Sequence, residues 1–178
     1  MAQGSLPAGT TTFLFTDIEG STRLWEAQPE AMEGALAAHD ALLRGCIQSR
    51  GGHVFKTVGD AFCAAFEDPR RAIDAALAAQ AALVAAPWPG EAPLRVRIAL
   101  HTGTVQTRDG DYFGQPLNRV ARLLATVHGG QVVVSAATQE LVRDDLPDGA
   151  SLRGLGEHRL KDLGQPESVF QLCHPDLP

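Results

Sequence analysis

The sequence lacks the features that would direct it to nucleic acid, to a membrane or out of the cell. Its formal net charge is −6, whereas nucleic-acid binding requires a clustered basic surface. No apolar run approaches the roughly 18 residues of a membrane span. The N-terminal stretch MAQGSLPAG lacks the charged and apolar regions of a signal peptide. We therefore expect a cytoplasmic protein with no membrane and no nucleic-acid partner.

Cysteine is also scarce. The three cysteines, Cys46, Cys63 and Cys173, are widely spaced and form no C-x-x-C pair. An odd number of isolated cysteines is typical of reduced thiols in a cytosolic protein. We expect neither a disulfide nor a cysteine metal site.

No repeat, low-complexity tract or long linker divides the chain. Its 178 residues fit a single domain with a substantial core, and 44% apolar and 20% charged residues are ordinary for a globular protein. We expect one domain over residues 11–173, flanked by short tails at 1–10 and 174–178.

Strands and helices alternate, but not as a regular βαβ repeat. Apolar residues at three-to-four spacing predict helices over residues 30–47, 70–85, 117–127 and 136–143. Short apolar runs predict a first strand around Phe13, a hairpin turning at Gly59-Asp60, a strand in QVVVS and two closing strands around a turn at 164–166. Hairpins and intervening helices together favour an α+β sandwich, with a sheet on one side and helices on the other.

The stretch LRVRIALHTG alternates clearly and predicts another strand. Val96, Ile98 and Leu100 form its apolar side. We place Arg95 and Arg97 on the outward side of this strand, and we interpret TRDGDYFG, which follows, as a turn.

Two aspartates occur where predicted strands meet turns. Asp17 ends the strand TTTFLFTD, and Asp60 follows Gly59 in the predicted hairpin. Each alone is a common turn or helix-capping residue. Two carboxylates at one sheet edge also suit Mg²⁺, which takes few protein oxygens and leaves positions for water and phosphates.

Two further patterns fit a phosphate-bearing ligand. Gly20, Ser21 and Thr22 follow Asp17 at a helix start, where backbone N–H groups suit phosphates. Asn118 and Arg122 are four residues apart and share one helix face. An isolated N-x-x-x-R is more often a solvated face, but beside a cleft it can stabilise a transferring phosphoryl group.

The ordered combination of motifs is more specific than any one of them. FTDIEGST, FKTVGDAF and DYFGQPLNRVARL occur in that order and together resemble the class III nucleotide cyclase catalytic domain. HGGQVVVS and GEHRLKDLGQPESVFQL look like the same family, especially its compact bacterial members, and the resemblance runs from Thr11 to Leu172. It implies a ferredoxin-like (palm-type) sheet with helices packed on one face, and a cyclase catalytic domain over 11–173.

The resemblance also implies site residues. Two Mg²⁺ or Mn²⁺ ions per site would be held at Asp17, Ile18 and Asp60, and the adenine ring would be read by Lys56 and Asp111. The transition-state residues would be Asn118 and Arg122, and the phosphates would be bound by Lys161, Gly20, Ser21 and Thr22. Asp109 lies close to Asp111 and is the alternative base-reading acid.

Because one chain holds every position, the resemblance implies a head-to-tail homodimer with two shared sites, and an inactive monomer. The implied reaction is conversion of ATP to 3′,5′-cyclic AMP and pyrophosphate by two-metal in-line attack of the 3′-hydroxyl. Lys56 and Asp111 favour ATP because adenine offers a donor and an acceptor that guanine reverses. A guanylate cyclase, or a catalytically silent nucleotide-binding regulatory module, is the alternative, and a regulatory partner stays open.

Overall fold

The computed structural model describes residues 6–88, 94–161 and 163–177, and a mixed sheet forms the centre of that part of the chain. The strand order is β2-β3-β1-β4-β6-β8-β7, with β5 paired to β4 alone. The strands are β1 (Gly9–Ile18), β2 (His53–Val58), β3 (Ala61–Phe66), β4 (Val96–Arg108), β5 (Asp111–Phe113), β6 (Val132–Ser135), β7 (Ser151–His158) and β8 (Glu167–Cys173). The helices are α1 (Ser21–Ala27), α2 (Pro29–Gln48), α3 (Pro69–Ala85), α4 (Gln115–Leu124) and α5 (Ala136–Val142). The predicted α+β fold class is confirmed.

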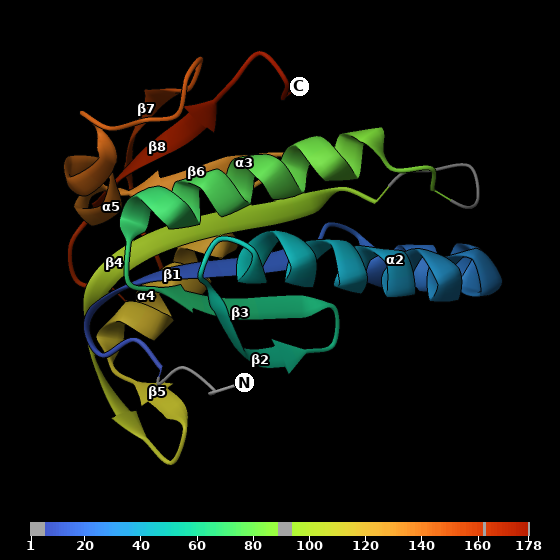
Figure 1. Ribbon diagram of the computed structural model, residues 1–178, viewed down its shortest axis with the longest axis horizontal. Coiled ribbons are helices and arrows are strands. Elements are labelled where there is room, and N and C mark those ends of the chain that lie inside the picture. Colours follow the sequence, from blue (N-terminus) through green and yellow to red (C-terminus); the bar gives the residue numbers. More distant parts are fainter. Residues whose placement is uncertain (1–5, 89–93, 162, 178) are drawn as a thin grey trace.

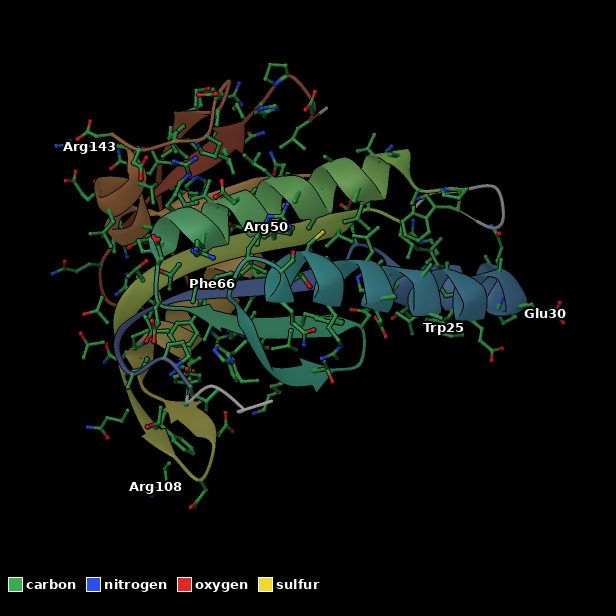
Figure 2. The ribbon with its side chains drawn as sticks, viewed as in Figure 1. Trp25, Glu30, Arg50, Phe66, Arg108 and Arg143 are labelled. Atoms are coloured by element: carbon green, nitrogen blue, oxygen red, sulfur yellow. The ribbon has the colours of Figure 1, made fainter. Side chains whose placement is uncertain are left out.

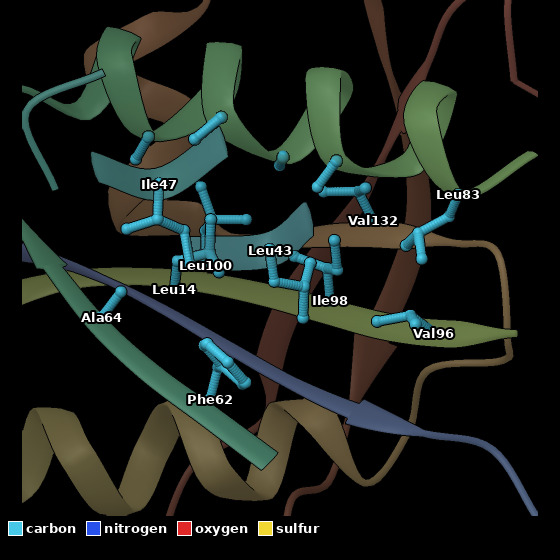
Figure 3. Packing of buried hydrophobic residues seen from close by; sticks show 14 of the residues in the cluster. Leu14, Leu43, Ile47, Phe62, Ala64, Leu83, Val96, Ile98, Leu100 and Val132 are labelled. Carbon is cyan, nitrogen blue, oxygen red and sulfur yellow. The ribbon is translucent and has the colours of Figure 1, made fainter. Parts of the chain in front are cut away.

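Helices α2 and α3 cover one face of the sheet and bury the larger core (Figure 1). Their apolar stripes meet alternate residues of β1, β3, β4 and β6, and the cluster includes Leu14, Leu43, Ile47, Phe62, Ile98 and Leu100 (Figure 3). The alternation follows from the pleat, which turns every second side chain of a strand to the same face. Strand residues between these therefore point to the opposite face.

The opposite face carries the candidate site. Helix α4 packs there through Val120 and Leu123, against a second cluster that contains Phe13 and Ala99. Asp17 shares this face with Phe13, because both lie at odd positions of β1. The predicted site is thus built on the face that α2 and α3 leave uncovered.

Strand β4 continues well past its predicted end and forms a hairpin with β5. We call residues 106–113 the arm; it projects from the body of the sheet, with Arg108 near its tip (Figures 1 and 2). Its two-residue turn is Asp109-Gly110, whose φ angles are 53° and 75°. Asp-Gly turns of this kind match the twist of paired strands. The segment interpreted as a plain turn is therefore an ordered β arm.

The four predicted helices and the Gly59-Asp60 hairpin are confirmed to within a few residues. Two elements differ from the prediction. Residues 21–27, expected only as a helix start, form the separate helix α1, and β7 begins at Ser151, before the predicted closing segment. Cys46, Cys63 and Cys173 are free, as expected.

Candidate active site

Asp17 lies directly across from an arginine on the neighbouring strand. The antiparallel register of β1 and β4 pairs Asp17 with Arg97. The Nε atom of Arg97 donates to Oδ1 of Asp17 at 2.6 Å, and Nη2 of Arg97 donates to Oδ2. These hydrogen bonds raise the pKa of the Arg97 guanidinium, against the opposing effect of burial. Arg97 lies on the side of β4 opposite Val96, Ile98 and Leu100, as expected, but there it is the counter-ion of Asp17.

Asp60 reaches the same place from the β2–β3 turn. Gly59, with φ of +58°, lets the chain turn tightly before it. Oδ1 of Asp60 accepts a hydrogen bond from the backbone N–H of Ile18 at 3.3 Å, so its carboxylate lies beside the residue that follows Asp17. The charges of Glu19 and Asp60 also help to raise the pKa of Arg97. We call Asp17, Glu19 and Asp60 the acidic cluster.

The acidic cluster has the chemistry of a site for a hard divalent ion. Asp17 and Asp60 offer carboxylate oxygens, and Ile18, whose side chain is buried, can offer only its backbone carbonyl. Ions such as Mg²⁺ take oxygen ligands and keep positions for water and phosphates. Within the described residues no set of three or more His, Cys, Asp or Glu side chains is arranged to hold a metal alone. The donor set therefore fits an ion that shares its coordination with a substrate.

The turn after the acidic cluster leads directly into a short helix. Gly20 adopts a left-handed conformation, with φ of 68°, and α1 begins at Ser21. Ser21 and Thr22 thus occupy the first turn of α1, beyond the end of β1. The sequence prediction of a helix start beside Asp17 is confirmed in this respect.

Lys56 and Asp111 are brought together from positions far apart in the chain. Nζ of Lys56, on β2, lies 3.5 Å from Oδ2 of Asp111, the first residue of β5. Both side chains are partly open to solvent, at 51% and 36% exposure, so a ligand can reach them. The arm places Asp111 here, whereas Asp109 forms the turn. Cys63 lies opposite Lys56 on β3, and burial raises its thiol pKa to about 11, so it stays a neutral thiol.

A separate pocket gathers the other predicted residues. It has a volume of about 230 Å³ and is lined by Gln115, Asn118, Arg122, Lys161 and Leu163. We call it the cationic pocket. Asn118 and Arg122 share one face of α4, as predicted, and Lys161 comes from the connection between β7 and β8. Neither metal-ligand candidate, Asp17 or Asp60, lines this pocket.

Comparison with known proteins decides the family. The family model described as the adenylate and guanylate cyclase catalytic domain matches residues 5–172. The chain belongs to this family. The cyclase domain is 47% identical over 173 residues to an uncharacterized protein of Mycobacterium tuberculosis, covering 96% of this chain and 58% of that protein. It therefore spans little more than half the length of that relative.

Two further relatives carry a function in their names. An adenylate cyclase of Schizosaccharomyces pombe is 35% identical over 216 residues, covering 96% of this chain and 13% of that protein. The structure of an adenylate cyclase from Trypanosoma brucei in its monomeric state aligns with a TM-score of 0.85 at 27% identity, covering 95% of this chain and 90% of that chain. The predicted class III cyclase resemblance is confirmed. None of the described helices of the cyclase domain is long and apolar enough to cross a membrane.

Sequence reasoning missed Arg97 as a site residue. The strand register could have identified it. In that register Arg97 lies directly across from Asp17, so the two side chains are on the same face of the sheet. That register is not readable from either strand alone.

Proposed function

We propose that the cyclase domain is an adenylate cyclase that converts ATP to 3′,5′-cyclic AMP and pyrophosphate. The O3′–Pα bond forms, the bond from Pα to the pyrophosphate oxygen breaks, and the hydroxyl proton passes to water. The observation that carries the choice of ATP is the Lys56–Asp111 pair. Lys56 can donate to N1 of adenine while Asp111 accepts from the 6-amino group, and guanine presents the reverse polarity.

The cationic pocket supplies the groups for the reacting phosphates. Arg122 would meet the negative charge that develops at the α-phosphoryl group and Asn118 would orient the ribose, and their position in one pocket supports these roles. Lys161, from the other side of the same pocket, neutralises the triphosphate. Positively charged groups fixed in advance lower the barrier because they need no reorganisation during the reaction.

The acidic cluster supplies the metal ligands. Asp17, Ile18 and Asp60 would hold two Mg²⁺ or Mn²⁺ ions, which when bound lower the pKa of the 3′-hydroxyl and neutralise the leaving group. Gly20, Ser21 and Thr22 would lie beside the phosphates as the chain turns into α1. Before metal binds, Arg97 balances the charge of Asp17.

The two half-sites support a shared arrangement. The cationic pocket contains none of the metal-ligand candidates, so we propose that two chains pair head to tail and that each site combines the acidic cluster of one with the cationic pocket of the other. Lys56 and Asp111 would read the base on the cationic side. Such a dimer has two equivalent sites, and a monomer has no complete one.

The test is cyclic-nucleotide formation by the purified protein, with ATP and GTP in parallel, each with Mg²⁺ and with Mn²⁺. We expect cyclic AMP to predominate. Formation of cyclic GMP from GTP with a kcat/KM equal to or higher than that for ATP would identify a guanylate cyclase instead. Bound ATP with no product under any condition would identify a silent regulatory module.

A matched pair of variants tests whether the Lys56–Asp111 pair selects ATP. Asp111→Asn replaces one acceptor oxygen by a donor, and we expect kcat/KM for ATP to fall at least fivefold, because a hydrogen-bonding group left unmatched under the bound base costs about 1–3 kcal/mol. Asp109→Asn makes the same change in the arm turn and should leave ATP selectivity unaltered. The reverse result would assign base reading to Asp109.

A further inference from the structure

An ion pair outside the proposed catalytic set joins α4 to the start of β8. Nη1 of Arg119 donates to Oε2 of Glu167 at 2.7 Å, and Oε1 of Glu167 accepts from the backbone N–H of Ala136 at 3.2 Å. The side chain of Glu167 is only 10% exposed and that of Arg119 is 28% exposed. Charge-assisted hydrogen bonds of this kind are stronger and more directional than neutral ones, and a buried carboxylate left without its partner is strongly unfavourable.

The ion pair lies between the two segments that line the cationic pocket. Arg119 directly follows Asn118 on α4 and precedes Arg122 by less than one turn. Glu167 ends the connection from β7 to β8 that carries Lys161, which comes from the opposite side of the pocket. One contact therefore joins α4, which carries Asn118 and Arg122, to the end of the connection that carries Lys161.

The same contact is tied to the buried centre of the sheet. Through Ala136, Glu167 holds the start of α5, and the preceding Ser135 accepts or donates a 2.6 Å hydrogen bond with Nδ1 of His101 on β4. Ser135 is fully buried and His101 is nearly so. The ion pair is thus anchored to rigid strands rather than to a loop, which is the condition for holding a site to sub-ångström tolerance.

We propose that Arg119 and Glu167 are positioning residues, which set the distance between Asn118 and Arg122 on α4 and Lys161 on the facing connection. This inference rests on the proposed function of the cationic pocket. Arg119 and Glu167 touch no reacting atom. They act by keeping the two sides of the pocket at the spacing that the transition state requires, and misplacement of a catalytic group by about 1 Å can cost 100-fold in rate.

Three variants separate positioning from simple stabilisation. Arg119→Met removes the charge but keeps an unbranched stem, and Arg119→Lys keeps a donor; lysine can replace an arginine that contributes one hydrogen bond to Glu167. The matched control is Arg143→Met, because Arg143 is an exposed arginine after α5, at the edge of the molecule (Figure 2).

We expect Arg119→Met to lower kcat for ATP at least tenfold while KM changes less than threefold, because the loss falls on interactions made in the transition state. Arg119→Lys should keep kcat within threefold of the parent, and Arg143→Met should match the parent. Circular dichroism and urea unfolding establish that each variant is folded under assay conditions. A folded Arg119→Met with kcat within twofold of Arg143→Met overturns the inference, and so does an Arg119→Lys as impaired as Arg119→Met.

Hydrogen exchange of the nucleotide-free protein tests, without turnover, whether the Arg119–Glu167 contact holds α4 against the start of β8. In Arg119→Met we expect amide exchange to rise several-fold in α4 and at the start of β8 together, and to stay unchanged in α3. Unchanged exchange in both segments overturns the inference whatever the activity. A parent protein that makes no cyclic nucleotide overturns the proposed function. Amide hydrogen exchange alone then decides whether Arg119 and Glu167 hold α4 against β8.

Discussion

The pairing of Arg97 with Asp17 determines the charge balance at the end of β1. The Arg97 guanidinium bonds Asp17 through two nitrogens, and the charges of Glu19 and Asp60 also act on it. A divalent ion bound by Asp17 has to share or replace that partner. We therefore expect Arg97 to stabilise the metal-free protein and to compete with the proposed metal for Asp17.

Arg97→Met separates these two effects. We expect the metal-free variant to lose about 1 kcal/mol of stability, because the pair is only partly buried and its loss leaves like charges together. We also expect Mn²⁺ to raise the thermal unfolding midpoint more in the variant than in the parent, since ligand binding to the native state alone is stabilising. The control is Arg95→Met, because Arg95 is exposed and directly precedes the same strand. An equal Mn²⁺ effect in all three proteins would contradict the expected competition.

His101 gives the domain a pH-dependent stability. Burial, and secondarily the charge of Arg119, lowers the pKa of His101 to about 4 from 6.5. Between these values the unfolded chain binds the proton and the folded chain does not, so stability is fully present above pH 6.5 and falls as pH decreases toward 4. The shift corresponds to roughly 3 kcal/mol. Urea unfolding at several pH values should show a flatter dependence for His101→Gln, and the parent slope for the exposed His128→Gln.

Among the elements, the arm has the clearest proposed role in base recognition. It begins where β4 leaves the main sheet, and its turn determines where Asp111 meets Lys56. Both turn residues have positive φ, which glycine adopts without strain and a β-branched residue does not.

Gly110→Val should therefore distort the arm and raise KM for ATP several-fold. The left-handed conformation costs a non-glycine residue about 1–2 kcal/mol, and relief of that strain moves Asp111 away from Lys56. Asp109→Gly is the matched control, because glycine tolerates the φ of 53° at that position, and its KM should stay at the parent value. Initial rates over a range of ATP concentrations measure both. Equal KM values for the two variants would show that the turn does not control base recognition.

The sequence predicted most elements because each carries its own signal. Helices α2 and α3 have continuous apolar stripes, and the Asp60 turn is marked by Gly59. The arm was missed because Asp-Gly was interpreted without its short partner strand. Contacts between elements could not be predicted from the periodicity of the sequence. Arg97 meets Asp17, and Arg119 meets Glu167, only because of the strand register and the packing of the folded chain. The placement of Lys56 beside Asp111 was predicted from the family resemblance, and the geometry agrees with it.

On the scale of the whole molecule, the acidic cluster and the cationic pocket are separate in one chain, and we propose that each is half of an active site. The proposed dimer predicts that two inactive variants restore each other. Asp17→Ala lacks a proposed metal ligand, and Arg122→Ala lacks a proposed transition-state residue. Mixed in equal amounts, they should recover about a quarter of the parent activity, because about half of the dimers are mixed and each of these has one intact site.

The measurement is cyclic AMP formation by the mixture against each variant alone, over a range of protein concentrations. Recovery should rise with concentration, as association requires. Asp17→Ala mixed with Asp60→Ala is the control, because both changes fall on the same half-site and no intact combination can form. Recovery in the control mixture as well would contradict the head-to-tail arrangement.

The β2–β3 hairpin carries Lys56 within β2 and Asp60 at its turn. In the proposed dimer these two residues belong to different sites, so one short, stiff hairpin is a member of both. We expect nucleotide bound at the first site to shift Lys56 and thereby the Asp60 carboxylate of the second. Occupancy of the two proposed sites would then be coupled, and we expect the ATP saturation curve to depart from a hyperbola. The one-site mixed dimer of Asp17→Ala and Arg122→Ala, measured by the same assay, should return to a simple hyperbola.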